Sequence, residues 1–176
     1  MVTPLTVTVG WLRHYLDCKA AGLDETAARR SASEAEGIKG KAYAHCRIKT
    51  GELRVPVSGG AGALKRRGAN PQLSEHGKWR REHTGAWNAA YGRTPYYEHL
   101  MPQLEAVYAT SEGESLESFN SRMLETALRW LDQESVAAAR APEMEGKRNE
   151  IKAKADESLS IFDLLFRLGK EGVFAL

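Results

Sequence analysis

A histidine in the middle of the chain lies between two tryptophans, at a spacing that predicts one shared helical face. Trp79, His83, Trp87 and Tyr91 recur every four residues, and side chains four apart lie on the same side of an α-helix. An imidazole in such a setting can act as a general base, because burial and neighbouring groups tune its pKa. It can equally be a packed histidine with satisfied ring nitrogens. We take His83 as the candidate catalytic residue and keep both interpretations open.

Two aromatic side chains are candidates to line a substrate pocket near this histidine. Trp79 belongs to the same helical stripe, and Tyr97 follows a proline-containing turn. Aromatic rings can stack on a sugar, although at the start of a helix they more often pack in the core.

A basic, glycine-rich stretch over residues 58–71 contains Lys65, Arg66 and Arg67 and has no apolar periodicity. It predicts a loop. Backbone N–H groups and cations of such a loop can wrap a phosphate, for example that of a sugar nucleotide or an acyl carrier. Because the stretch lacks a Walker pattern, a solvated connector is the simpler interpretation.

The two cysteines offer weaker signals. Cys46 follows His45 on an expected strand, which would allow an acyl-thioester mechanism, but a buried structural thiol is the commoner case. His14 and Cys18 stand four apart without a second ligand pair, so we assign no metal and no cofactor.

The elements that position these residues are mostly helical. Alternation predicts a short strand over residues 5–9, and period-two patterns over 43–57 predict a β-hairpin. Helical spacing predicts helices over 11–21, 24–30, 79–91, 100–108, 116–131 and 159–168, with Asp24 as an N-cap and Ser160 with Asp163 as a capping box. The charged segment 135–157 should be exposed. We expect an α+β fold, mostly helical, with a small antiparallel hairpin in the N-terminal half.

Composition narrows the class of protein. The chain has 176 residues, 42% of them hydrophobic and 27% charged, with a formal net charge of +2. This length and balance predict one globular domain, residues 1–176. The small net charge argues against a nucleic-acid module, for which the motivation is the basic loop and the basic residues from Lys78 to Arg81. Two cysteines, no signal-peptide pattern and no long apolar run predict a cytoplasmic protein without a membrane span.

Three ordered segments resemble the WbqC-like protein family. The first runs over residues 38–57, where Lys39, Cys46, Pro56 and Val57 fit best. The second is the Trp-x-x-x-His helix from Trp79 to His83, continued by Tyr91 and the aromatic pair after Pro95. The third, Leu-Ser-Ile-Phe-Asp-Leu-Leu-Phe over residues 159–166, is similar to a C-terminal family block.

The resemblance implies a cytoplasmic transferase, of aminoacyl or glycyl groups, in the assembly of bacterial surface polysaccharide such as O-antigen. An activated sugar or acyl precursor would then be its partner, with Lys39 and the basic loop binding an anionic group. Ala44 and His45 depart from the family's expected Asn-Arg pair. This departure and the lack of a complete nucleophile or cofactor motif favour the alternative, a non-enzymatic binding or assembly protein. The oligomeric state stays open.

Overall fold

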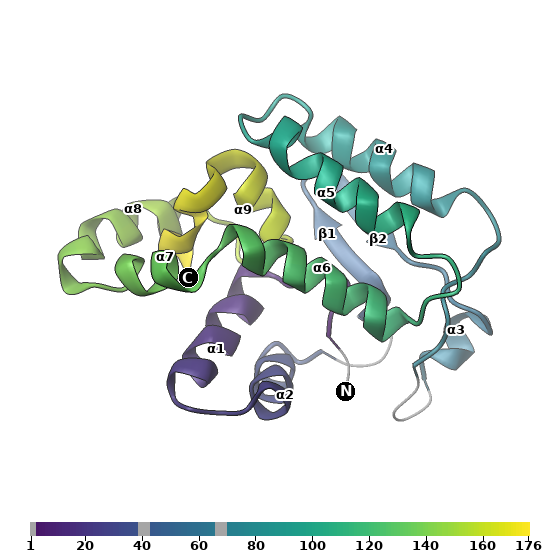
Figure 1. Cartoon of the computed structure of the whole chain (residues 1–176), viewed down its shortest axis with the longest axis horizontal. Helices are drawn as coiled ribbons and strands as arrows, with labels where there is room; N and C mark the ends of the chain where they lie inside the picture. The colour runs from purple at the N-terminus through teal and green to yellow at the C-terminus, as the bar shows by residue number, and fades with distance from the viewer. Residues whose placement is uncertain (1–2, 39–42, 66–69) are drawn as a thin grey trace.

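The computed structural model describes residues 3–38, 43–65 and 70–176. Along the chain its elements are α1 (Val9–Ala20), α2 (Glu25–Ala35), β1 (His45–Ile48), β2 (Gly51–Arg54), α3 (Gly60–Ala63), α4 (Trp79–Tyr91), α5 (Tyr97–Ala109), α6 (Leu116–Trp130), α7 (Gln133–Ala139), η2 (Pro142–Met144), α8 (Glu145–Lys154), α9 (Ile161–Leu168) and η3 (Gly169–Ala175). The expected α+β fold, mostly helical with a small antiparallel sheet, is confirmed (Figure 1).

The hairpin forms because its apolar residues alternate. β1 and β2 pair antiparallel, with Cys46 opposite Leu53 and His45 opposite Arg54. Cys46 and Leu53 are buried, whereas Arg54 is exposed. One face of the hairpin therefore joins the core, and the other carries polar side chains.

Helix α9 lies at the centre of the core. It contacts α1, α4, α5 and α6. Phe162 meets the Trp87 ring edge-on at 5.9 Å, and Phe166 stacks on Tyr91 at 5.0 Å. These contacts join both ends of the chain in one cluster of buried apolar side chains, and on this basis we propose that residues 1–176 form one domain.

Helix α9 is capped by a serine side chain at its start and by a glycine at its end. At its start, the Ser160 hydroxyl accepts a hydrogen bond from the backbone N–H of Phe162. Asp163 does not complete the expected capping box, because its carboxylate pairs with Arg167 at 2.7 Å. At its end, Gly169 has a φ of 56°, and a Cβ there would lie 2.6 Å from the Tyr96 ring. Only glycine fits that position.

The strand predicted over residues 5–9 is wrong. The segment bends at Leu5 and Thr6, its one β-bridge among the described residues joins Thr8 to Ser160, and α1 already begins at Val9. The Thr8 hydroxyl accepts a hydrogen bond from the backbone N–H of Trp11, which starts the helix. Leu5, Thr6 and Val7 are all buried, so the alternation did not mark an exposed face.

Two further segments form short helices. Within the described part of the 58–71 stretch, Gly60–Ala63 forms the one-turn helix α3, where a loop was predicted. The charged segment 135–157 is built from α7, η2 and α8, with most side chains exposed while Val136, Ala139 and Ile151 are buried.

Candidate functional site

His83 is buried, and both of its ring nitrogens have partners. Its side chain is 4% exposed, with Nε2 3.1 Å from the carbonyl oxygen of Arg54 and Nδ1 3.3 Å from the Tyr108 hydroxyl. A carbonyl only accepts, so Nε2 carries the proton and Nδ1 accepts from Tyr108. Burial lowers the pKa of His83 to about 4, against the hydrogen bond to Arg54 that raises it. This geometry supports a structural histidine; the catalytic role of His83 stays a prediction.

The two aromatic candidates line neither of the two hollows described below. Trp79 is buried, donates its indole N–H to the backbone oxygen of Ser74, and meets the His83 ring at 5.3 Å. Tyr97 is half-buried and packs on Phe166 at 5.4 Å. Both side chains are parts of the aromatic core in this structure, and their substrate-binding roles stay predictions.

The basic candidates can be placed only in part. Lys65 is exposed just beyond α3, whereas Lys39, Arg66 and Arg67 lie outside the described residues. Their binding of an anionic group stays a prediction.

The polar face of the hairpin places an imidazole beside a carboxylate. Nδ1 of His45 on β1 lies 2.9 Å from Oε1 of Glu52 on β2. The other carboxylate oxygen, Oε2, accepts from Nε and Nη2 of Arg54 at 3.0 and 2.8 Å. The hydrogen bonds from His45 and Arg54 hold the pKa of Glu52 below its usual value. Glu52 is thus an acceptor at neutral pH, and Nδ1 of His45 carries the proton.

This tautomer leaves the second nitrogen of His45 as a base. With Nδ1 protonated, Nε2 presents its lone pair, and it makes no hydrogen bond within the described part of the chain. The side chain of His45 is 21% exposed. A carboxylate that fixes the tautomer and stabilises the imidazolium is the arrangement that general-base histidines use.

A hollow of about 380 Å³ opens beside this pair. The segment before α1, the end of α2, the hairpin and Ser158 before α9 all line it. Its polar groups include Thr8, Glu36 and Arg47 as well as the two members of the pair. The Thr8 hydroxyl donates to Glu36 at 3.3 Å. The hollow therefore holds a base, two carboxylates and one guanidinium.

Cys46 also borders this hollow, but its thiol is buried. Burial raises the pKa of Cys46 to about 12; the Thr6 hydroxyl lowers it and the Glu52 carboxylate raises it. A thiol with that pKa has almost no thiolate at neutral pH. The geometry supports the structural interpretation of Cys46 over the acyl-thioester one.

Comparison with known families identifies the chain. The model of the WbqC-like protein family matches residues 38–156, more than half of the sequence. The chain belongs to this family. The comparison with curated proteins and the comparison with solved structures each return no match. Within the described residues, no helix is long and apolar enough to cross a membrane, and no group of three or more His, Cys, Asp and Glu could hold a metal ion.

The WbqC-like match covers two of the three resembling segments. The hairpin block and the Trp79–His83 helix lie inside residues 38–156, whereas the block over 159–166 lies beyond the matched range. His45, Arg47 and Glu52 lie inside the range, while Thr8 and Glu36 lie before it. The hollow is therefore built by the WbqC-like segment together with flanking residues of this chain.

Sequence reasoning missed the pair of His45 and Glu52. Once the hairpin is placed with Cys46 and Leu53 facing inward, alternation puts both polar residues on the outer face. That signal was present in the sequence. What it lacked was the register, which makes them diagonal neighbours across the two strands.

Proposed function

We propose that this WbqC-like protein is a cytoplasmic transferase in the assembly of bacterial surface polysaccharide such as O-antigen, and that it moves an aminoacyl group, with glycyl the leading candidate. An activated acyl or sugar precursor is its partner. The observation that carries the proposal is the hydrogen bond between His45 and Glu52 at the edge of the hollow.

The proposed reaction uses His45 as the base. Nε2 of His45 takes the proton from a hydroxyl or amine of the glycan acceptor while that atom bonds to the carbonyl carbon of the activated donor. The bond from the carbonyl carbon to the leaving group then breaks, and His45 returns the proton to the leaving group. Glu52 stabilises the imidazolium that exists between the two proton transfers.

The other polar groups of the hollow suit an aminoacyl donor. A glycyl group carries an ammonium at neutral pH and no side chain, and the carboxylate of Glu36 is a fitting partner for that ammonium. Arg47 supplies a cation for an anionic part of the donor, such as a phosphate. A neutral sugar without an amine would leave Glu36 without a charge partner in the substrate.

A non-enzymatic binding or assembly protein is the second candidate. It is favoured by the burial of His83 and Cys46, which removes two of the chemical groups that the sequence offered. In that case the hollow would bind the same class of precursor, and the hydrogen bond of His45 to Glu52 would only orient a donor group.

The test uses variants of the pair in the bacterium that makes the surface glycan. His45→Gln and Glu52→Gln are compared with His99→Gln, an exposed histidine on α5. We expect the surface-glycan profile on a gel to change in the first two strains, with thermal midpoints of the purified variants close to that of the parent. Binding of the precursor with no turnover in the parent protein would select the second candidate. Normal glycan in both pair variants would exclude this site from either function.

A further inference from the structure

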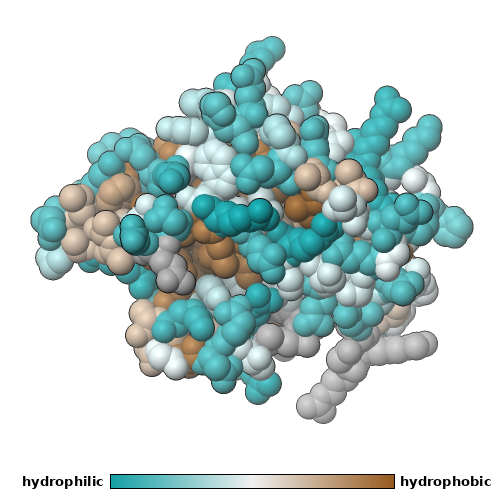
Figure 2. Space-filling model, viewed as in Figure 1, coloured by the Kyte–Doolittle hydropathy of each residue, from teal (hydrophilic) through white to brown (hydrophobic). Residues whose placement is uncertain are grey.

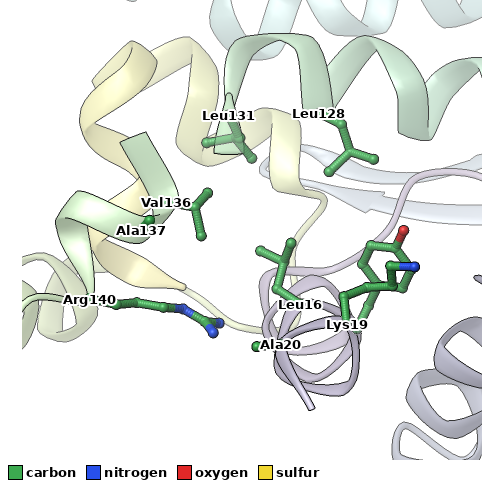
Figure 3. Close-up of a pocket in the computed structure, with 9 residues that line it drawn as sticks. Leu16, Lys19, Ala20, Leu128, Leu131, Val136, Ala137 and Arg140 are labelled. Carbon is green, nitrogen blue, oxygen red and sulfur yellow. The ribbon is translucent and has the colours of Figure 1, made fainter. Parts of the chain in front are cut away.

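A second hollow, of about 480 Å³, lies between α1, the end of α6 and α7 (Figure 3). Leu16 projects into it from α1, Leu128 from α6, Leu131 from just beyond α6, and Val136 from α7. The surface view shows hydrophobic residues exposed in the region between these helices (Figure 2). The volume falls within the range of small-molecule sites. It shares no lining residue with the hollow beside His45.

Both charged residues that line this hollow are cations. Lys19 lies on α1, and Arg140 follows α7. In Figure 3 they lie along the lower edge of the space with Leu16 and Ala20 between them, and Leu128 and Leu131 lie along the upper edge. The hollow thus has an apolar wall and, along the opposite edge, two separated cations.

The carboxylates that pair with these cations lie outside the lining. Arg140 binds Asp17 at 2.7 Å. Lys19 lies 3.8 Å from Glu25, whose carboxylate is held more closely by the Tyr15 hydroxyl at 2.7 Å and by Arg29 at 2.5 Å. Lys19 is therefore the most weakly held of the three partners of Glu25. An anion in the hollow would gain a nearby cation without displacing a carboxylate from the lining itself.

We propose that this hollow binds an amphiphile: one aliphatic chain against the leucines and Val136, ending in a carboxylate or phosphate beside Arg140. The aliphatic lining fits a flexible chain, and the Arg140 cation fixes its direction. This site is independent of the proposed transferase reaction, because it uses different residues and needs no turnover.

Chain-length dependence tests the apolar wall. Calorimetry with hexanoate, octanoate and decanoate, each below its micelle-forming concentration, should show one saturable site that tightens about fourfold per added methylene until the hollow is full. Decyl phosphate should also bind, and its affinity relative to decanoate identifies the preferred head group. Decanol should bind more weakly than decanoate, and decylammonium should not bind.

Four variants test the residues. Arg140→Gln should weaken decanoate binding about tenfold or more, because a charged hydrogen bond is lost. Asp17→Asn breaks the same ion pair but keeps the cation, so decanoate binding should stay equal or become tighter. Ala137→Phe and Ala20→Leu add volume at exposed helical positions of the lining and should each weaken binding. Arg93→Gln removes an exposed cation outside the lining and should change nothing.

The absence of saturable binding would overturn the proposal, and so would equal affinity for decylammonium and decanoate. Equal weakening by Asp17→Asn and Arg140→Gln would also overturn it, because it would mean that Arg140 only holds α7 against α1. A further contrary result would come from sedimentation velocity. A concentration-dependent dimer that Ala137→Phe and Ala20→Leu abolish, in a protein that binds no decanoate, would make this face an interface between copies of the chain.

Discussion

The Nδ1 atom of His83 accepts a hydrogen bond from the hydroxyl of Tyr108 at 3.3 Å, deep in the core between α4 and α5. The same hydroxyl accepts from the indole N–H of Trp87 at 3.2 Å. Since Nε2 of His83 donates to the backbone of Arg54, the chain of hydrogen bonds ties both helices to the hairpin. These hydrogen bonds can form only while the imidazole of His83 is neutral, because a protonated Nδ1 cannot accept from Tyr108.

The neutral state of His83 gives a pH prediction. Its pKa falls from 6.5 to about 4 on folding, so the folded state binds fewer protons than the unfolded state between these values. The contribution of neutral His83 to the free energy of unfolding should therefore be fully present above about pH 6.5. It should be lost as the pH drops toward 4, by on the order of 3 kcal/mol. Urea unfolding at pH 7.5, 5.5 and 4.5 measures this, and NMR titration of the ring gives the pKa directly.

His83→Gln separates the structural role from the catalytic one. Its amide can donate to the Arg54 carbonyl and its oxygen can accept from Tyr108, so the variant should fold but lose the pH dependence between 6.5 and 4. Because both ring nitrogens of His83 are bonded within the core, the cell's surface glycan should stay normal. A lost glycan in a variant of unchanged stability would restore the catalytic interpretation of His83.

Phe162→Ala should be among the most destabilising single changes. The side chain is 1% exposed and packs against Trp87 and Phe166, so its removal should cost about 3–5 kcal/mol in the free energy of unfolding. Phe174→Ala is the matched control, because Phe174 is half-buried and contacts Lys147; it should cost clearly less. Equal and small costs in urea denaturation would mean that α9 is not part of the cooperative core.

The two cysteines should react at very different rates. With a pKa of about 12, about one Cys46 thiol in ten thousand is ionised at pH 8, and the side chain is buried. Cys18 is half-buried on α1. In the Cys18→Ser variant, Cys46 should react very slowly with an aromatic disulfide reagent, measured by the absorbance of the released thiolate. It should react fast only after the protein is unfolded. Fast reaction of that variant in its native state would instead support a nucleophilic Cys46.

The basic stretch yields a prediction about anion binding. Replacing Lys65, Arg66 and Arg67 together with Gln should weaken the binding of sugar nucleotides, and the parent affinity should fall as salt rises. Calorimetry at two salt concentrations measures both effects. Lys154→Gln, at an exposed position of α8, is the control. If the triple variant binds as the parent does, the stretch is a solvated connector.

The fold could be predicted where a local pattern decides the structure. The stripe of α4 and the alternation of the hairpin each bury one face, and the apolar run of α9 is buried on all sides. Each of these elements was predicted in place. The segment around Val7 could not be assigned in this way, because its partner is Ser160 at the other end of the chain. Alternation alone does not show whether a strand has a neighbour.

The sequence indicated the kind of residue at the candidate site, a histidine, but not which histidine. His83 has the spacing of a site residue, yet its partners Arg54 and Tyr108 come from other elements and satisfy both nitrogens. His45 drew attention only through Cys46, and its partner Glu52 follows from strand register. Contacts between distant residues, rather than residue type, decided which histidine faces a hollow.

The junction at Ser160 also bears on how the protein is made. Its backbone N–H bonds to Arg47 in the hairpin, the neighbouring N–H of Ile161 bonds to Val7, and α9 then fills the core. During synthesis the ribosome releases the N-terminal segment and the hairpin long before it releases α9. The nascent chain must therefore keep those apolar faces uncovered until α9 emerges from the ribosome, so these contacts cannot form while only the first half of the chain has been made.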